Sequence, residues 1–190
     1  MIQVNEKRNL TMLMDYYELT MANGYYTLGL KDQRVCFDLF FRRVPENGGY
    51  VIAAGLETII SYVKDMHFTD GDIEYLRNKK IFDEGFLEYL RNFTFTGDID
   101  AVPEGTPVYP NTPIVTVCAP MGEAQILETM LLLSINHQSL IATKANRIVR
   151  AAGDKVVMEF GARRAHGYDA AIYGARACAI GGAKMTANSL

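Results

Sequence analysis

Two adjacent arginines, Arg163 and Arg164, stand where a binding loop is expected. They follow an apolar stretch, 155–161, that predicts a short buried strand, and they precede an Ala-rich stretch, 170–180, that predicts a helix. In parallel α/β folds ligands collect at the carboxyl ends of strands, where a guanidinium can pair with a carboxylate or phosphate through two hydrogen bonds. The loop therefore predicts an anion site. The alternative is a solvated surface pair, because arginine is mostly exposed in folded proteins.

Two pairs of tyrosines lie on one segment, 11–30, whose apolar spacing predicts an amphipathic helix. Tyr16 stands beside Tyr17, and Tyr25 beside Tyr26. Such rings can form a stacking platform for a planar ligand, since an aromatic pair contributes about 0.5–1.5 kcal/mol beyond the burial of its area. Packing in the core is the alternative role.

The sequence lacks the motifs that are typical of metal binding, nucleophilic catalysis and nucleotide binding. The histidines show no metal-like spacing with carboxylates or cysteines, and no serine or cysteine stands in a nucleophile motif. No metal site is therefore predicted. His166, beside the arginines, is either a functional imidazole or a neutral loop residue. The glycine-rich loops of nucleotide-binding proteins do not occur, and Gly181 with Gly182 alone is a weak phosphate signal.

The composition is that of an ordinary globular protein, with 190 residues, 49% of them hydrophobic, and a formal net charge of −3. This charge provides no positive field that would attract nucleic acid or anionic lipid. Three widely spaced cysteines, Cys36, Cys118 and Cys178, argue against a disulfide framework or a zinc knuckle and favour a reducing compartment. We find neither a signal peptide nor a membrane span, and expect a cytoplasmic protein without a membrane partner.

The elements that must position these residues are mixed helix and strand from the start. After the helix within 11–30, alternating apolar residues predict a largely buried strand at 34–42. A turn then leads to a second strand, 50–54, which is expected to return beside the first as a hairpin. Three helices come next, and Thr69 and Asp83 are placed to cap the second and third. The three helices are predicted at 56–66, 70–78 and 84–91.

The remaining pattern predicts a change of architecture near residue 120. A proline-rich segment reads as a compact β element with strands at 98–102, 108 and 114–118. A helical pattern over 121–152 predicts two helices or one bent helix. From residue 155 onwards, strand, helix and strand predict a parallel βαβ unit. We therefore predict an α/β protein with an amino-terminal α/β domain, 1–120, and a second region, 121–190, whose sheet or barrel cannot close before Leu190.

Several short motifs follow one another along the chain. They are Asp15–Ala22, Phe37–Arg42, Ala53–Glu57, Phe82–Leu87, Val102–Gly105, Gln125–Thr129, Leu140–Ala145 and Glu159–Ala165. These motifs resemble the start of nicotinate phosphoribosyltransferase, and they occur in the same order as in that family. The resemblance covers about residues 10–188, although proteins of that family are more than twice as long.

The resemblance implies a reaction and an architecture. Nicotinate and phosphoribosyl pyrophosphate would give nicotinate mononucleotide and pyrophosphate, coupled to ATP hydrolysis, in the salvage route to NAD. Mg²⁺ would assist, and a homodimer would share its active sites between subunits. The fold implied is an amino-terminal α/β domain followed by the incomplete start of an irregular α/β barrel.

The resemblance also assigns binding residues. Tyr17 would stack on the pyridine ring from the neighbouring subunit, and Phe160 would form the other wall. Arg163 and Arg164 would hold the nicotinate carboxylate and the substrate phosphates. Asn188 is a further candidate, although Met185 and Ala187 replace small residues that are usual in the family's stretch there.

No catalytic residue is expected within the chain, because the family's phosphorylated histidine would lie beyond Leu190, and we expect the isolated chain to be inactive. His166 stands where the family usually has glutamine. Two other interpretations stay open. One is a related type II phosphoribosyltransferase that acts on nicotinamide or quinolinate. The other is a non-catalytic interaction module whose incomplete sheet associates with another subunit.

Overall fold

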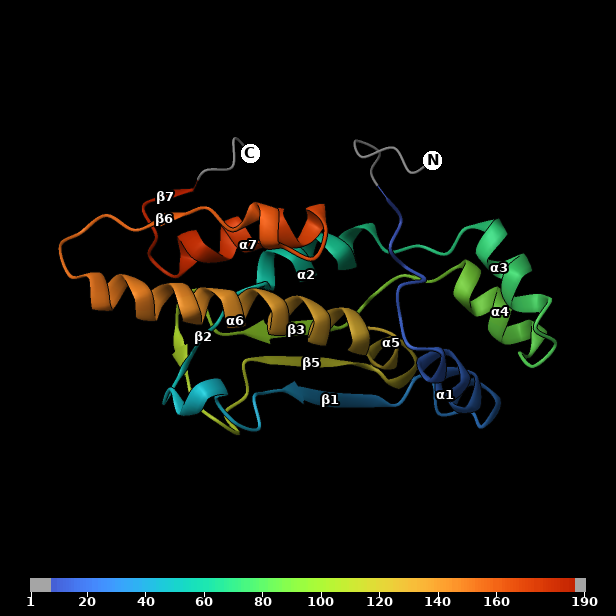
Figure 1. The fold of residues 1–190 in the computed structure, drawn as a ribbon. Coiled ribbons are helices and arrows are strands. Elements are labelled where there is room, and N and C mark those ends of the chain that lie inside the picture. Colours follow the sequence, from blue (N-terminus) through green and yellow to red (C-terminus); the bar gives the residue numbers. More distant parts are fainter. Residues whose placement is uncertain (1–7, 187–190) are drawn as a thin grey trace. The chain divides into compact units, whose positions relative to one another are not determined.

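The structure is a computed structural model that describes residues 8–186 of the 190, and Figure 1 shows its elements in chain order. Contacts group the chain into two units that alternate along the sequence. The first unit holds residues up to Phe37, Ile59–Ile99 and Val117–Met130. The second unit holds Asp38–Thr58, Asp100–Thr116 and the residues from Leu131 onwards. The predicted division into 1–120 and 121–190 stays a prediction.

Helix α1 (Tyr16–Thr27) confirms the helix predicted within 11–30. Asp15 precedes it in an extended conformation and forms a capping box with Glu18, so backbone N–H groups at the start of the helix have side-chain acceptors. In the first unit α1 packs against the short helix α5 (Met121–Gln125). The first turn of α1 is thereby fixed by local contacts.

Helices α3 (Asp70–Arg77) and α4 (Glu84–Arg91) pack side by side in the first unit, as Figure 1 shows. The predicted caps are confirmed, because the side chains of Thr69 and Asp83 each accept a hydrogen bond from a backbone N–H in the first turn of their helix. The facing sides of the two helices are apolar. Their fully buried residues are Ile73, Leu76, Phe86, Leu87 and Leu90.

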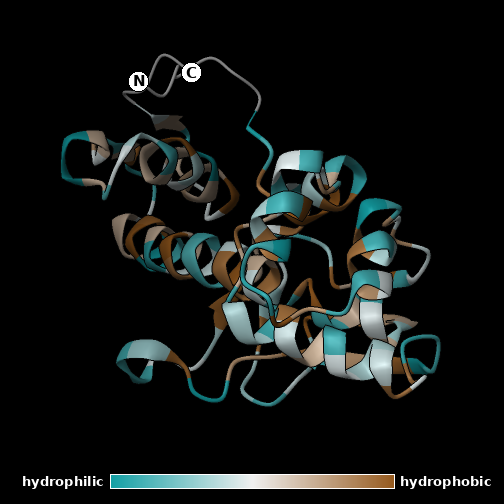
Figure 2. Ribbon diagram, turned by 90° about the vertical axis from the view of Figure 1, so that its right-hand side faces the viewer, coloured by the Kyte–Doolittle hydropathy of each residue, from teal (hydrophilic) through white to brown (hydrophobic). Residues whose placement is uncertain are grey.

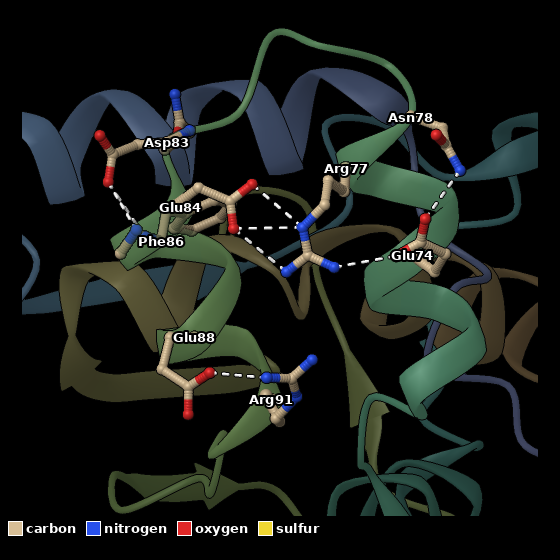
Figure 3. Close-up of polar contacts among 10 residues, drawn as sticks. Glu74, Arg77, Asn78, Asp83, Glu84, Phe86, Glu88 and Arg91 are labelled. Carbon is tan, nitrogen blue, oxygen red and sulfur yellow. Dashed lines mark hydrogen bonds and ion pairs between the residues drawn. The ribbon is translucent and has the colours of Figure 1, made fainter.

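Ion pairs cover the solvent side of these two helices (Figure 3). Arg77 lies between Glu74 and Glu84, with guanidinium nitrogens 2.9 and 3.0 Å from their carboxylate oxygens. Arg91 pairs with Glu88 at 2.8 Å. Because these side chains are largely solvated, each pair contributes little to stability. The apolar contacts beneath them hold the helices together.

The strands form separate small sheets. Strands β1 (Arg34–Leu39), β5 (Val115–Pro120) and β3 (Asp98–Ala101) make one sheet in the order β1-β5-β3. Strand β2 (Val51–Ile52) pairs antiparallel with β4 (Pro107–Val108). The predicted hairpin between the first two strands is therefore wrong.

The physical reason is a better partner farther along the chain. The N–H of Ala53 donates to the carbonyl of Thr106 at 2.9 Å, and the N–H of Gly105 donates to the carbonyl of Ala53 at 2.8 Å. These bonds extend the β2–β4 ladder beyond its two paired residues. The segment after β1 meanwhile forms a short 3-10 turn at Pro45–Asn47.

Strand β1 is exposed rather than largely buried, which corrects the sequence-based expectation. Phe37 and Phe40 are 44% and 39% exposed. Among the described residues β1 lies at an edge of its sheet, so its side chains have neighbouring strand residues on one side only, beside β5. In β5, by contrast, alternate residues are buried, as the period-two pattern requires.

Cys36 on β1 and Cys118 on β5 form a disulfide. The expectation that wide spacing argues against disulfide pairing is therefore wrong for this pair. The two cysteines are 82 residues apart in sequence, yet their strands are neighbours in one sheet. Cys178 is a free thiol, and burial raises its pKa, so its thiolate form is disfavoured.

The helical pattern over 121–152 divides into α5 and the long helix α6 (Glu128–Ala152), which is the first of the two predicted alternatives, two helices rather than one bent helix. In the second unit, α6 bonds the backbone around β2. The Thr143 hydroxyl accepts from the N–H of Ile52 at 2.8 Å, and the Ser139 hydroxyl bonds both the N–H and the carbonyl of Ala54 at 3.0 Å. Figure 2 shows hydrophobic and hydrophilic residues alternating along the helices, as in helices that bury one side.

The close approach of α6 to the backbone after β2 requires a glycine at position 55. Gly55 has φ of +111°, and a Cβ there would lie 2.6 Å from the carbonyl oxygen of Ser134 on α6. Both the backbone conformation and the space exclude a larger side chain. Helix α2 (Leu56–Asp65) begins at the next residue.

The last described elements confirm the predicted βαβ unit. Strand β6 (Met158–Glu159) pairs in parallel with β7 (Met185–Thr186), and α7 (Tyr168–Ile180) connects them. The predicted buried strand over 155–161 is reduced to two paired residues that are exposed or half-buried. Among the described residues β7 is the one strand beside β6, so the rest of the segment 155–161 has no strand to pair with. No helix in residues 8–186 is long and apolar enough to cross a membrane.

Candidate functional site

The two arginines lie on a short structured loop, residues 160–167, which we call the arginine loop. It comes after β6, and Ala162–Arg164 form a single 3-10 turn closed by a 2.8 Å hydrogen bond from the N–H of Arg164 to the carbonyl of Gly161. The loop ends at Gly167, whose φ of +106° suits glycine and leads directly into α7. The predicted position, between a strand and the next helix, is confirmed.

Arg163 and Arg164 are both exposed. Within residues 8–186 neither guanidinium has a hydrogen-bond or ion-pair partner, unlike Arg77, Arg91, Arg147 and Arg176. The first turn of α7 comes directly after the loop, and the partial positive charge of a helix N-terminus adds to the two cations. The loop is therefore a local positive site on a chain of net charge −3.

Phe160 opens the arginine loop and is 61% exposed. The loop thus carries a large exposed ring and two exposed arginines within residues 160–164. This combination suits a planar anion, because the ring can stack while the cations pair with its charge. Asn188, the other candidate near this end of the chain, lies outside the described residues.

Tyr17 lies on the first turn of α1 in the first unit and is 44% exposed. Interaction of its hydroxyl with the Glu128 carboxylate, with smaller contributions from burial and from nearby carboxylates, raises the pKa of Tyr17 to about 12. The phenol is therefore neutral at physiological pH. The structure provides an exposed ring at this position, as a stacking role requires.

The other tyrosines of α1 have different surroundings. Tyr26 packs its ring 6.0 Å from Phe86 and 6.1 Å from Tyr89, so core packing is its role. Tyr16 is exposed on one side and makes an edge contact with Phe82 at 5.9 Å. Tyr26 therefore does not fit the tyrosine platform suggested by the sequence, whereas Tyr16 and Tyr17 on the first turn of the helix have exposed rings.

The predicted site residues fall into two groups. Phe160, Arg163 and Arg164 lie together on the arginine loop of the second unit, whereas Tyr17 lies in the first unit. The loop group is brought together by local chain geometry. Their binding roles stay predictions.

Sequence reasoning missed a polar network in the second unit. Arg176 on α7 pairs with Glu104 through two contacts of 2.9 and 2.6 Å and also donates to the Gln138 side chain at 3.1 Å. The Glu104 carboxylate in addition accepts from the N–H groups of Gly55 and Leu56, at the start of α2. The network ties the helix after the arginine loop to the segment around β2.

Glu104 and Arg176 each stabilise the charged form of the other. Burial acts to raise the pKa of Glu104, but the Arg176 guanidinium and the two backbone N–H groups outweigh it and hold that pKa below its ordinary value. The Glu104 carboxylate in turn raises the pKa of Arg176. Glu104 lies in the Val102–Gly105 motif, which was its one sequence signal, whereas its partner is 72 residues away.

A second missed residue is Glu18, which is completely buried on the first turn of α1. Its carboxylate accepts from the backbone N–H and the hydroxyl of Thr129. The spacing of Asp15 and Glu18 matches a capping box, and this was the local signal that could have located it.

The described residues do not form a metal site. No group of three or more His, Cys, Asp or Glu side chains in residues 8–186 is arranged to hold a metal ion. Mg²⁺ in enzymes of phosphorylated substrates is bound by carboxylates together with substrate phosphates. We therefore derive no step through Mg²⁺ or ATP from this chain.

Comparisons with known proteins agree on one family. The family model described as the nicotinate phosphoribosyltransferase N-terminal domain matches residues 12–136. A nicotinate phosphoribosyltransferase of Bacillus subtilis is 47% identical over 180 residues, which is 95% of this chain and 37% of that relative. The chain thus spans less than two fifths of the length of that relative.

Solved structures give the same result. The human nicotinic acid phosphoribosyltransferase superposes with a TM-score of 0.86 at 34% identity and covers 92% of this chain and 36% of its own. A nicotinate-nucleotide pyrophosphorylase from Pyrococcus furiosus, with a TM-score of 0.75 at 23% identity, covers 99% of this chain and 41% of its own. The second match shows similarity of fold alone.

Proposed function

The chain belongs to the nicotinate phosphoribosyltransferase family, and we propose that the protein carrying it converts nicotinate and phosphoribosyl pyrophosphate into nicotinate mononucleotide and pyrophosphate. The observation that carries the proposal is the arginine loop, which holds an exposed phenylalanine and two exposed arginines whose guanidinium groups are unpaired among residues 8–186. Nicotinate is a flat ring with one carboxylate, so it needs both features.

The proposed role of these residues is to bind and orient the ring. The lone pair of the pyridine nitrogen forms a bond to C1 of the ribose while the bond from C1 to the pyrophosphate oxygen breaks, and pyrophosphate leaves with the bonding electrons. Such a centre is loose and oxocarbenium-like, so catalysis depends on positioning and on cations near the leaving group. Arg163 and Arg164 would hold the carboxylate or a phosphate, and Phe160 would hold the ring.

Tyr17 would supply the opposite wall of the aromatic slot. Its exposed, neutral ring suits stacking on a pyridine. We propose that this wall comes from a second copy of the protein, in a homodimer with shared active sites. Coupling to ATP hydrolysis, in the manner of a ligase, assistance by Mg²⁺ and a cytoplasmic location belong to the same proposal, because they accompany this reaction in NAD salvage.

The experiment is a binding and turnover comparison of three pyridines with the protein as its gene encodes it. Isothermal titration with nicotinate, nicotinamide and quinolinate should show tightest binding of nicotinate, and product analysis should show nicotinate mononucleotide. Tighter binding of quinolinate, which carries two carboxylates, or of nicotinamide, which carries none, would overturn the proposed activity in favour of that of another type II phosphoribosyltransferase.

One observation favours a non-catalytic interaction module as the second candidate. Edge strand β1 exposes Phe37, and Phe40 directly after the strand is also exposed; an exposed apolar edge favours association with another chain. Analytical ultracentrifugation of the purified chain tests this role. A monomer across a concentration series would remove the support for it.

A further inference from the structure

Glu18 makes an unusual set of contacts for a carboxylate on the first turn of a helix. It is completely buried, and one of its oxygens, Oε1, receives every hydrogen bond that it accepts from the described residues. The donors are the Thr129 N–H at 3.1 Å, the Thr129 hydroxyl, and the Asp15 N–H at 3.3 Å. The other oxygen, Oε2, is buried without a partner among the described residues.

Thr129 lies on the first turn of α6, where backbone N–H groups have no acceptor within their own helix. Glu18 supplies that acceptor from another helix. The Thr129 hydroxyl also accepts from the Asp15 N–H at 3.0 Å, so the bonds run in both directions. We call these contacts among Asp15, Glu18 and Thr129 the Glu18–Thr129 clamp. It joins the starts of α1 and α6 within the first unit.

Burial of the Glu18 carboxylate costs free energy, because it removes the charged form from water. Burial raises the pKa of Glu18 and only its hydrogen bonds to Thr129 and Asp15 oppose that effect, while the Glu128 carboxylate adds to it. The Tyr62 hydroxyl, which feels the charge of Glu18, is likewise buried without a partner among the described residues. An apolar residue at position 18 would avoid these costs. The hydrogen bonds of the clamp offset part of this cost.

Tyr17 lies inside the clamp. It stands between Asp15 and Glu18 in sequence, and its hydroxyl interacts with Glu128, the neighbour of Thr129 on α6. Since the Asp15 N–H on one side of Tyr17 and the Glu18 side chain on the other are bonded to Thr129, the turn that carries the ring has little freedom to shift relative to the start of α6. A stacking residue held in this way needs little reordering when a planar ligand arrives.

We propose that Glu18 and Thr129 are positioning residues that hold the ring of Tyr17 in place for the pyridine substrate. The proposal rests on the function proposed above. Neither residue needs to touch substrate, since both act through the first turn of α1. Loss of the clamp should therefore weaken binding of the pyridine and leave binding of phosphoribosyl pyrophosphate unchanged.

The test uses Thr129→Val, which removes the hydroxyl at nearly constant shape, and Thr129→Ser, which keeps it. A matched control is Thr96→Val. Thr96 bonds the buried Glu123 through its N–H at 2.6 Å and its hydroxyl at 2.9 Å, which is the same chemistry in the same unit but outside the Glu18–Thr129 clamp. In the protein as its gene encodes it, Thr129→Val should raise KM for nicotinate about tenfold and leave kcat and KM for phosphoribosyl pyrophosphate unchanged.

Thr129→Ser keeps the hydroxyl and Thr96→Val leaves the clamp unchanged. Both variants should therefore keep KM for nicotinate within about twofold of the value for the unsubstituted protein. An equal rise in KM for both substrates, or an equal effect of Thr96→Val, would assign the clamp a merely structural role. If Thr129→Val does not fold, Thr129→Ala carries the same expectation, and circular dichroism confirms folding of each variant.

A second readout does not depend on activity. Protein labelled with 3-fluorotyrosine gives a ¹⁹F resonance for Tyr17, assigned by its loss in Tyr17→Phe. Thr129→Val should shift or broaden that resonance, and Thr96→Val should not. An unchanged Tyr17 resonance in Thr129→Val would overturn the proposal. Absence of nicotinate turnover in the unsubstituted protein would instead overturn the proposed function, while the ¹⁹F result still decides whether the clamp positions the ring.

Discussion

The Arg176 guanidinium holds Glu104 through two contacts, at 2.9 and 2.6 Å, although the residues are 72 positions apart. The same carboxylate bonds the N–H groups that open α2, at 2.6 and 3.0 Å. The Glu104 side chain thus pairs with a cation and also accepts hydrogen bonds from the backbone N–H groups at the start of a helix. Because Arg176 belongs to α7, which begins directly after the arginine loop, the pair anchors the helix on which that loop depends.

Replacement of Arg176 should destabilise the protein. Arg176→Ala should lower the free energy of unfolding by about 1.5–3 kcal/mol, the range for hydrogen bonds to a charged group. Arg176→Lys should recover only part of this loss, because an ammonium cannot form the two parallel contacts. Urea titration followed by circular dichroism measures both. Arg150→Ala, at an exposed position of the same unit, is the control and should have little effect.

Glu104 should make stability fall in acid. Its pKa is lowered in the folded state from an ordinary value of 4.5, so its stabilising contribution is complete above that pH. The contribution is lost as the pH falls through the lower folded pKa, because the unfolded chain then binds the proton more readily. Glu104→Gln should be less stable than the unsubstituted protein at neutral pH, and the difference should shrink in acid. A difference that grows in acid would contradict this sign.

The ring of Tyr17, rather than its hydroxyl, should carry pyridine binding. Tyr17→Phe should keep most of the affinity for nicotinate, whereas Tyr17→Ala should lose about 0.5–1.5 kcal/mol or more of binding free energy, the contribution of an aromatic pair. Isothermal titration measures both. Since Tyr17 is 44% exposed, neither change should greatly alter the melting temperature. Equal losses in the two variants would assign binding to the hydroxyl.

The disulfide between Cys36 and Cys118 predicts a pattern of thiol reactivity. Under non-reducing conditions, mass spectrometry of proteolytic fragments should find the peptides of these two residues linked, while Cys178 is alkylated after unfolding. Reduction should lower stability by an amount within the usual range of about 2–4 kcal/mol. Alkylation of all three cysteines without a reductant would show that the bond does not form.

Local signals were enough to predict most helices. Thr69 and Asp83 mark the starts of their helices because a cap acts within one turn, and the apolar period identifies the turns of helix after each cap. The arginine loop could be predicted for a similar reason, since a strand and a helix adjoin it in sequence. These features depend on neighbours only a few residues away.

The features that could not be predicted depend on distant partners. The pairing of β2 with β4, the bond between Cys36 and Cys118, and the exposure of β1 are all determined by which strands meet. The buried carboxylate of Glu18 and its partner Thr129 are 111 residues apart, so a charge that looks solvated in the sequence is an internal contact. Periodicity describes one element and does not identify its neighbour.

The most direct test of the central claim is the preference of the protein for nicotinate over nicotinamide, measured with and without the guanidinium groups of the arginine loop. The two substrates share a ring and differ in the carboxylate, so a paired charge should show as a difference between them. In the Arg163→Ala, Arg164→Ala double variant we predict that the ratio of kcat/KM for nicotinate to that for nicotinamide falls at least about tenfold. The melting temperature should stay unchanged, since both side chains are exposed and unpaired among residues 8–186. An unchanged ratio would contradict the claim that this loop recognises the carboxylate.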